Sequence, residues 1–259
     1  MKYISIIFSF IVILVMNCGP KSFHVEEELS INFNKAMKFF NKEKYSRARD
    51  EFDYIIKIEP GSQLANDAQY YKGESLFKLK EYDDAWATFD RYIRFSNDFV
   101  KIEKSRYRIC ECAIFSSNSY QRVQKQTKRA LEQLQMFIED FPKSTLILDA
   151  EQSIMKLRIK LAKKEYEVGR LYLKLEEYES ALIYFRLVLN SYYDTNLADE
   201  ARIGIIFTHI LDGNHNGAKR YFEAEKNSFL ESEKYSMAES LILETETGLK
   251  INHYYQLYK

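Results

Sequence analysis

Cysteines and histidines are the residues of this chain with the greatest capacity for chemistry, and their spacing forms no recognisable catalytic or metal-binding set. Cys110 and Cys112 stand two positions apart, which on a helix points their side chains about 200° away from each other. We therefore expect two separate thiols that pack in the interior rather than a disulfide or a metal site. The four histidines lie far apart in the sequence, and no His-Glu-x-x-His segment occurs: His24, His209, His215 and His253.

Other catalytic patterns are equally missing from the sequence. There is no Gly-x-Ser-x-Gly turn and no glycine-rich phosphate loop, and the chain has only eight glycines from which to build one. Paired carboxylates such as Glu176 and Glu177 fall on polar helix faces, which offer no environment for acid–base catalysis. We predict no enzyme, no catalytic residues, no cofactor and no metal ion.

The third cysteine, Cys18, follows an apolar run from Ile4 to Met16 with Lys2 before it. That run is too short to span a bilayer and fits the apolar region of an export signal. The residues from Leu14 to Cys18 resemble a bacterial lipobox, although Met16 and Asn17 stand where small residues are usual. We predict a lipoprotein signal peptide over 1–17 and a lipidated tether over 18–28, with Cys18 as the acylated residue. An ordinary signal peptide and an apolar N-terminal element with an incidental cysteine stay open as alternatives.

Composition indicates what kind of domain follows. Hydrophobic residues make up 46% of the chain and charged residues 29%, which is enough apolar matter for a core and too much for disorder. Eight glycines and three prolines are few for the tight turns of an all-β protein. The 38 basic residues balance the 38 acidic ones, so charge gives no indication of nucleic-acid binding. We expect an all-α protein that binds no nucleic acid.

One pattern repeats along the chain, a small residue followed four positions later by a large apolar one. The aligned pairs are Ala48 and Phe52, Ala85 and Phe89, Ala130 and Leu134, Ala181 and Phe185, and Ala218 and Phe222. Twelve positions before three of these alanines stands another small residue: Ala36, Gly73 and Gly169. Small residues at both places let two helices approach closely, and the pattern resembles the tetratricopeptide repeat of about 34 residues. We predict a tetratricopeptide-like right-handed superhelix of about five helix pairs over 29–259.

Helix-ending residues fall where such pairs need them. Pro60-Gly61 is expected to end the first pair, Phe141-Pro142 the third, and Asp212 to Asn214 to separate the last two helices of the repeats. The sequence also predicts an insertion over 116–126, a long first helix of the fourth pair over 148–175, and a final helix over 231–249 that covers the open end.

First helices of such repeats line a concave face, so residues along them predict a groove. On the first two pairs these positions are strongly aromatic, and aromatic and Met surfaces suit peptide ligands. The predicted peptide-binding groove consists of Phe33, Met37, Phe40, Tyr70, Glu74 and Phe77. The alternative is that these side chains only pack between repeats.

The run from Leu157 to Tyr172, continued by Tyr178, Ala181 and Phe185, resembles the fourth repeat of the BamD family, tetratricopeptide lipoproteins of the β-barrel assembly machinery. The second repeat adds Tyr70-Tyr71, Glu74 to Phe77 and Phe89 to Arg94, again similar to this family. The resemblance extends from Cys18 to about Phe222 and departs from the family where Asn97 and Tyr193 replace prolines.

This resemblance implies a non-enzymatic scaffold anchored at the periplasmic face of the outer membrane. It implies as partners the POTRA region of BamA, other Bam lipoproteins and unfolded outer-membrane protein precursors, with contact to the membrane through the lipid. Two alternatives stay open: another periplasmic tetratricopeptide scaffold similar to CpoB, and an envelope enzyme with accessory repeats. No heptad run precedes Phe33 to favour the first, and no residues remain for the catalytic domain that the second requires.

Overall fold

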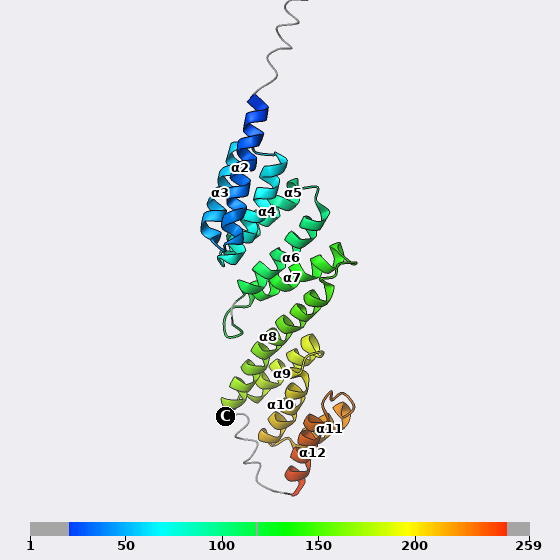
Figure 1. The fold of residues 1–259 in the computed structure, drawn as a ribbon. Helices are drawn as coiled ribbons and strands as arrows, with labels where there is room; N and C mark the ends of the chain where they lie inside the picture. The colour runs from blue at the N-terminus through cyan, green and yellow to red at the C-terminus, as the bar shows by residue number, and fades with distance from the viewer. Residues whose placement is uncertain (1–20, 118, 248–259) are drawn as a thin grey trace, which may run out of the picture. The chain divides into compact units, whose positions relative to one another are not determined.

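The computed structural model describes residues 21–117 and 119–247, and these ranges form helices and short connections only (Figure 1). The predicted signal peptide and the acylation site Cys18 lie outside the described residues. Within the described ranges no helix combines the length and the apolar character needed to cross a membrane. The helices of these ranges are α2 (Lys21–Asn41), α3 (Tyr45–Ile58), α4 (Gln63–Lys78), α5 (Tyr82–Phe95), α6 (Phe99–Phe115), α7 (Lys125–Asp140), α8 (Ile147–Lys174), α9 (Tyr178–Tyr192), α10 (Leu197–Leu211), α11 (His215–Glu225) and α12 (Ser232–Thr247).

The chain divides into two compact units, with the boundary between Ser116 and Ser117. Unit 1 contains α2 to α6, and each of these helices packs against the next. Unit 2 contains α7 to α12, in which α8 packs on α9, α9 on α10, and α12 on both α10 and α11. The two helices predicted as the third pair, α6 and α7, therefore belong to different units.

The repeated small-large pattern occupies the second helix of each predicted pair and is confirmed in all five. The small residue is Ala48, Ala85, Ala130, Ala181 or Ala218, and each is 0% or 1% exposed. The large residue four positions on is buried as well, and in the first four pairs a third buried apolar residue follows after one more turn: Ile55, Tyr92, Phe137 and Val188. Positions i, i+4 and i+7 share one face of a helix, so each of these helices presents one apolar stripe to its unit.

Glycines on the facing helices allow the closest approaches. A Cβ atom added to Gly73 in α4 would lie 2.7 Å from the ring of Phe89 in α5. In unit 2 the ring of Phe185 in α9 lies between two such glycines, because a Cβ on Gly169 in α8 or on Gly204 in α10 would come within 2.9 Å of it. The close pairing predicted for Gly73 and Gly169 is thus confirmed, whereas the sequence did not predict the role of Gly204.

Four of the interhelical turns share one backbone geometry. The residue before last in each turn has a positive φ: Glu43 (56°), Lys80 (64°), Glu176 (60°) and Gly213 (73°). The next residue donates its N–H to a carbonyl five positions back, as in the bond from Glu81 N to Leu76 O at 3.0 Å. This is the Schellman arrangement, in which a left-handed residue satisfies the last carbonyls of a helix.

The remaining helix ends match the sequence prediction closely. α3 ends at Ile58 before Pro60-Gly61, α7 ends at Asp140 before Pro142, and α8 spans Ile147–Lys174. The insertion is the loop between α6 and α7, and three lysines of α8 contact it. Lys160 Nζ donates to Ser117 Oγ at 2.8 Å, Lys164 Nζ donates to Arg122 O at 3.0 Å, and Lys163 lies over the ring of Tyr120.

The start of the first helix differs from the prediction. Residues 21–28 were expected to lack helical structure as part of the tether, but they form the first turns of α2. Leu29, at 1% exposed, is the first residue of α2 that is buried among the described side chains. Glu27 and Glu28, just before it, are exposed.

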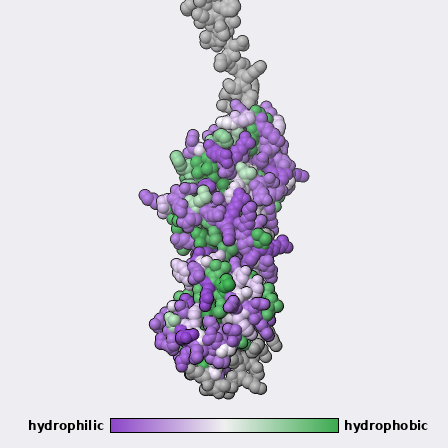
Figure 2. All heavy atoms as spheres, turned by 180° about the vertical axis from the view of Figure 1, so that it is seen from behind, coloured by the Kyte–Doolittle hydropathy of each residue, from purple (hydrophilic) through white to green (hydrophobic). Residues whose placement is uncertain are grey.

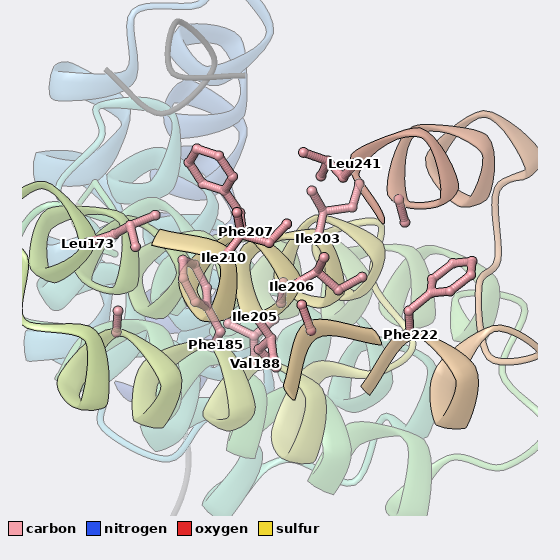
Figure 3. Packing of buried hydrophobic residues seen from close by; sticks show 14 of the residues in the cluster. Leu173, Phe185, Val188, Ile203, Ile205, Ile206, Phe207, Ile210, Phe222 and Leu241 are labelled. Atoms are coloured by element: carbon pink, nitrogen blue, oxygen red, sulfur yellow. The ribbon is translucent and has the colours of Figure 1, made fainter. Parts of the chain in front are cut away.

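Each unit has its own apolar interior. Unit 1 has two clusters, one around Phe52 between α2, α3 and α4, and one around Phe89 between α4, α5 and α6. The cluster of unit 2 is larger and is centred on α10, whose Ile203, Ile205, Ile206 and Phe207 are all fully buried (Figure 3). Because residues on every side of α10 are buried, this helix is the centre of unit 2.

Candidate functional site

The six residues predicted as a peptide groove lie on α2 and α4 of unit 1. Phe33, Met37 and Phe40 pack against the cluster around Phe52, and Tyr70 and Phe77 pack against the cluster around Phe89. Their side chains are half-buried, and neighbouring rings meet edge to face or tilted, at centroid distances between 5.3 and 6.1 Å. The structure thus places them on one continuous aromatic surface between the first helices, which we call the α2–α4 aromatic face.

Tyr71 joins the two halves of this face. Its ring stacks on Phe52 at 5.7 Å and meets both Phe33 and Phe40 edge to face, while Tyr70 contacts it from the same helix at 5.3 Å. Aromatic pairs in such geometry are favourable beyond the area that they bury. Most of each ring is therefore committed to packing between repeats, and only a minor part of its surface is available to a ligand.

Glu74 is the charged member of the predicted set, and it is paired inside the protein. Its carboxylate, 7% exposed, accepts hydrogen bonds from Nε and Nη2 of Arg108 in α6, at 2.7 and 3.1 Å. The same guanidinium lies over the ring of Phe77 at 4.6 Å and donates to Glu111 at 2.6 Å. Arg108 therefore closes one end of the aromatic face and holds α6 against α4.

Burial of Tyr70 and the ion pairs of Arg108 raise the pKa values of these two side chains. Burial raises the pKa of Tyr70 to about 12, and the charge of Glu74 adds to the effect. Burial alone would lower the pKa of Arg108, but its hydrogen bonds and charge interactions with Glu74 and Glu111 outweigh burial and raise it. The aromatic rings of the face therefore lie beside two cations, the Arg108 guanidinium over Phe77 and the Lys101 ammonium over Tyr70.

Arg108 and a second cation, Lys101, were not predicted as part of this site, although the sequence contains a signal for both. Lys101 Nζ lies 2.5 Å from Asp67 Oδ1, and both this pair and the Arg108–Glu74 pair join residues 34 positions apart. Lys234 and Glu200 in unit 2 repeat the same separation at 2.5 Å. Because 34 residues is the usual length of one repeat, opposite charges at that spacing indicate ion pairs between equivalent positions of successive first helices.

The last helix of unit 2 is fixed by a buried carboxylate. Asp199, 1% exposed, accepts hydrogen bonds from the backbone N–H groups of Leu230 and Glu231, each at 2.8 Å, just before α12 begins. Its other oxygen accepts from Arg202 at 2.8 Å, and Arg202 in turn bonds Glu225 of α11 at 3.2 Å. One aspartate thus connects α10, α11 and the start of α12, and the predicted covering helix is confirmed as packing on the last pair.

The two cysteines of unit 1 behave as the sequence predicted. Cys110 and Cys112 are free and buried, and burial raises the pKa of each thiol to about 12. Such thiols stay protonated and unreactive. Among the described residues, no group of three or more His, Cys, Asp or Glu side chains is placed to hold a metal ion.

On the face seen in Figure 2, the described residues present a largely hydrophilic surface with apolar side chains gathered in separate patches. Paired helices, small residues at their crossings and recurring left-handed turns define an all-helical protein of the tetratricopeptide-repeat type. Its side chains suit the binding of other polypeptides.

The chain belongs to the YfiO family of outer membrane lipoproteins, whose family model matches residues 26–209. Three curated relatives are each named outer membrane protein assembly factor BamD. The protein from Rickettsia prowazekii is 25% identical over 210 residues, which covers 81% of this chain and 84% of the relative. Those from Caulobacter vibrioides and Buchnera aphidicola are 22% and 23% identical, and each match covers 78% of this chain, with 66% and 87% of the respective relatives.

Solved structures with a similar arrangement include two helical-repeat proteins. MamA from Desulfovibrio magneticus is 15% identical, with a TM-score of 0.36 and coverage of 76% of this chain and 92% of that one. The TPR2AB domain of yeast Sti1 in complex with a pHSP90 is 11% identical, with a TM-score of 0.39 and coverage of 85% and 99%.

Proposed function

We propose that this chain is an assembly factor for outer-membrane β-barrel proteins, a scaffold without catalytic activity of its own that is held at the periplasmic face of the outer membrane by acyl chains on Cys18. The observation that carries this proposal is the family match over 26–209. The names of the three curated relatives supply the process. The lipobox-like segment before Cys18 supplies the anchor, since several acyl chains hold a soluble domain at a membrane stably.

The partners that fit this role are a barrel protein with POTRA domains, as BamA has, other lipoproteins of the same machinery, and unfolded barrel precursors. The α2–α4 aromatic face supports the last of these. Its rings are partly exposed, and Phe115 of α6, 56% exposed, extends it, because its ring meets that of Phe77 edge to face at 5.8 Å. Aromatic surfaces of this kind bind extended polypeptide through apolar side chains with little loss of side-chain entropy.

Purification of the chain from detergent-extracted membranes, followed by identification of bound proteins, tests the partners. We expect a large barrel protein with POTRA domains to co-purify, and its absence from repeated purifications would contradict the proposed role. Cys18→Ala tests the anchor, because this variant should stay folded but leave the membrane fraction. Unchanged sedimentation and unchanged palmitate labelling in Cys18→Ala would refute the acylation site.

A photo-crosslinking residue tests the aromatic face. Placed at Phe77, it should crosslink to newly exported barrel precursors. The matched control is Tyr54 of α3, which is 49% exposed on the second helix of its pair and lies outside the face. Equal crosslinking from Phe77 and Tyr54 would show that precursors contact the surface without preference for this face.

A further inference from the structure

One end of unit 1 exposes more apolar surface than its packing explains. Helices α2 to α6 follow one another with short connections, and each packs on the next, so the start of α2, the α3–α4 turn and the α5–α6 turn lie toward the same end of unit 1 (Figure 1). A hollow of about 460 Å³ lined by Pro60, Gly61 and Phe95 shows that the two turns adjoin. We call this the N-terminal end of unit 1.

Four large apolar side chains are exposed at this end. Ile58 is 40% exposed, Phe95 69%, Phe99 81% and Val100 62%. Phe99 and Val100 are the first two residues of α6, where the helix start needs only the cap that Asp98 provides by accepting a bond from Lys101 N at 3.1 Å. The fold therefore does not explain why these four apolar side chains are exposed. Exposed apolar patches commonly mark a surface that contacts another protein or a membrane.

The charges around these side chains argue against an acidic protein or an anionic ligand as the binding partner. Arg94 forms an ion pair with Asp90 on its own helix, and Lys101 is paired with Asp67 at 2.5 Å and with Asp98 at 3.5 Å. Most of the nearby positive charge is thus neutralised within unit 1. Exposed aromatic rings beside internally paired charges suit the interfacial layer of a bilayer, where aromatic side chains are enriched.

We propose that Ile58, Phe95, Phe99 and Val100 insert into the lipid interface next to the acyl anchor. This inference rests on the anchoring proposed above. If Cys18 carries the acyl chains, the Gly19-Pro20 segment limits the distance from the lipid surface to the start of α2 to about 10 Å, even when extended. Because α2 begins at Lys21, two turns before the buried Leu29, α2 must lie inclined to the membrane normal for the patch to reach the bilayer. The acyl chains and the patch together hold unit 1 in one orientation on the membrane.

Lipid quenching of a single tryptophan measures this insertion. The acylated full-length protein is purified from membranes and reconstituted in phosphatidylcholine vesicles with or without bromine on the acyl chains. Trp86, the one native tryptophan, is replaced by Phe, and Phe99→Trp is added. We expect brominated lipid to reduce the fluorescence of the Phe99→Trp protein at least twofold.

Phe115→Trp in the same background is the matched control. Phe115 is also exposed and belongs to the same helix, but it lies at the opposite end, about 24 Å away along the axis of α6. Its fluorescence should change by less than a tenth on bromination. Far-UV circular dichroism and thermal melting establish that both variants are folded.

The outcomes separate the inference from the function on which it rests. Equal quenching in the Phe99→Trp and Phe115→Trp proteins, with masses that show acylation of both, would overturn the inference and leave the proposed anchor intact. A mass without acyl chains would overturn the anchor, and with it the reason for placing this end at the bilayer. Absence of quenching at Phe99→Trp, together with self-association that Phe99→Glu abolishes, would show that a second copy of the chain covers the patch instead.

Discussion

Gly73 provides the most direct test of the packing described above. A Cβ at this position would lie 2.7 Å from one ring carbon of Phe89 and 2.9 Å from two others. Favourable carbon–carbon contacts lie at about 3.5 to 4.0 Å, so the ring would have to move by almost 1 Å. Phe89 is fully buried, which leaves it no path toward solvent.

The expected effect of Gly73→Ala is the sum of two opposing contributions. Overpacking of a close-packed core costs about 1 to 3 kcal/mol. Alanine is a better helix former than glycine by about 0.8 to 1.0 kcal/mol. We therefore expect Gly73→Ala to lower the free energy of unfolding by about 1 kcal/mol, measured by urea denaturation with circular dichroism.

Phe89→Leu separates these contributions, because the smaller side chain makes room for the new methyl group. In the Phe89→Leu background, Gly73→Ala should raise the free energy of unfolding by about 1 kcal/mol, since only the helix propensity remains. The coupling between the two positions would then be about 2 kcal/mol, within the range for residues in contact. The matched control is Gly61→Ala, because its Cβ meets nothing within 4 Å and its cost comes only from a φ of +90°. A Gly73→Ala effect of the same sign and size in both backgrounds would refute the close approach of α4 and α5.

Three further predictions concern single side chains. Asp199→Ala should lower the free energy of unfolding by about 3 to 5 kcal/mol, because it leaves Arg202 without its closest buried partner. Amide hydrogen exchange across α12 should become faster, since the bonds from Leu230 and Glu231 to Asp199 are lost. Unchanged exchange would contradict the role of Asp199 in holding this helix. Lys80→Gly should raise the free energy of unfolding by about 0.5 to 1 kcal/mol, since glycine adopts a positive φ without strain, and a loss of stability there would argue against the left-handed turn. The hydrogen bond from Arg158 lowers the pKa of Asp194 below the value of about 3.9 in an unfolded chain, so this pair stabilises the fold above about pH 4 and its contribution disappears as pH falls through the lower folded pKa. Asp194→Asn should therefore show a weaker dependence of stability on pH in acid, and an unchanged acid profile would contradict the pairing.

The features that the sequence predicted correctly are those with a local cause. Ala85 and Phe89 lie one turn apart on one helix, so their shared burial follows from helix geometry alone. The helix ends at Pro60-Gly61 and Pro142 follow from residues that cannot continue a helix. The start of α2 was misplaced because residues 21–28 show no apolar periodicity. Glu26 to Glu28 nevertheless favour a helix by intrinsic propensity.

The features that were missed join elements distant in the sequence. Gly204 faces Phe185 of the preceding pair rather than a partner in its own pair, so alignment within one repeat did not reveal it. The Arg108–Glu74 pair likewise crosses from one repeat to the next, and only a comparison of charges at one repeat length would have found it. For the α2–α4 aromatic face, the sequence located the right helices, but it did not show how much of each ring the neighbouring repeat covers.

The predicted third helix pair, α6 and α7, is divided between the two units. Its connection is the loop from Ser116 to Gln124, whose own hydrogen bonds, from Gln124 to Ser119 O and Arg122 O, give it an internal order. Elsewhere, adding a single residue would change the Schellman geometry and rotate the following helix out of register. A change of length in this loop would leave the apolar clusters around Phe52, Phe89 and α10 in place, because none of their residues lies in it. Descendants of this gene can therefore vary the length of the connection between unit 1 and unit 2 without redesigning either interior.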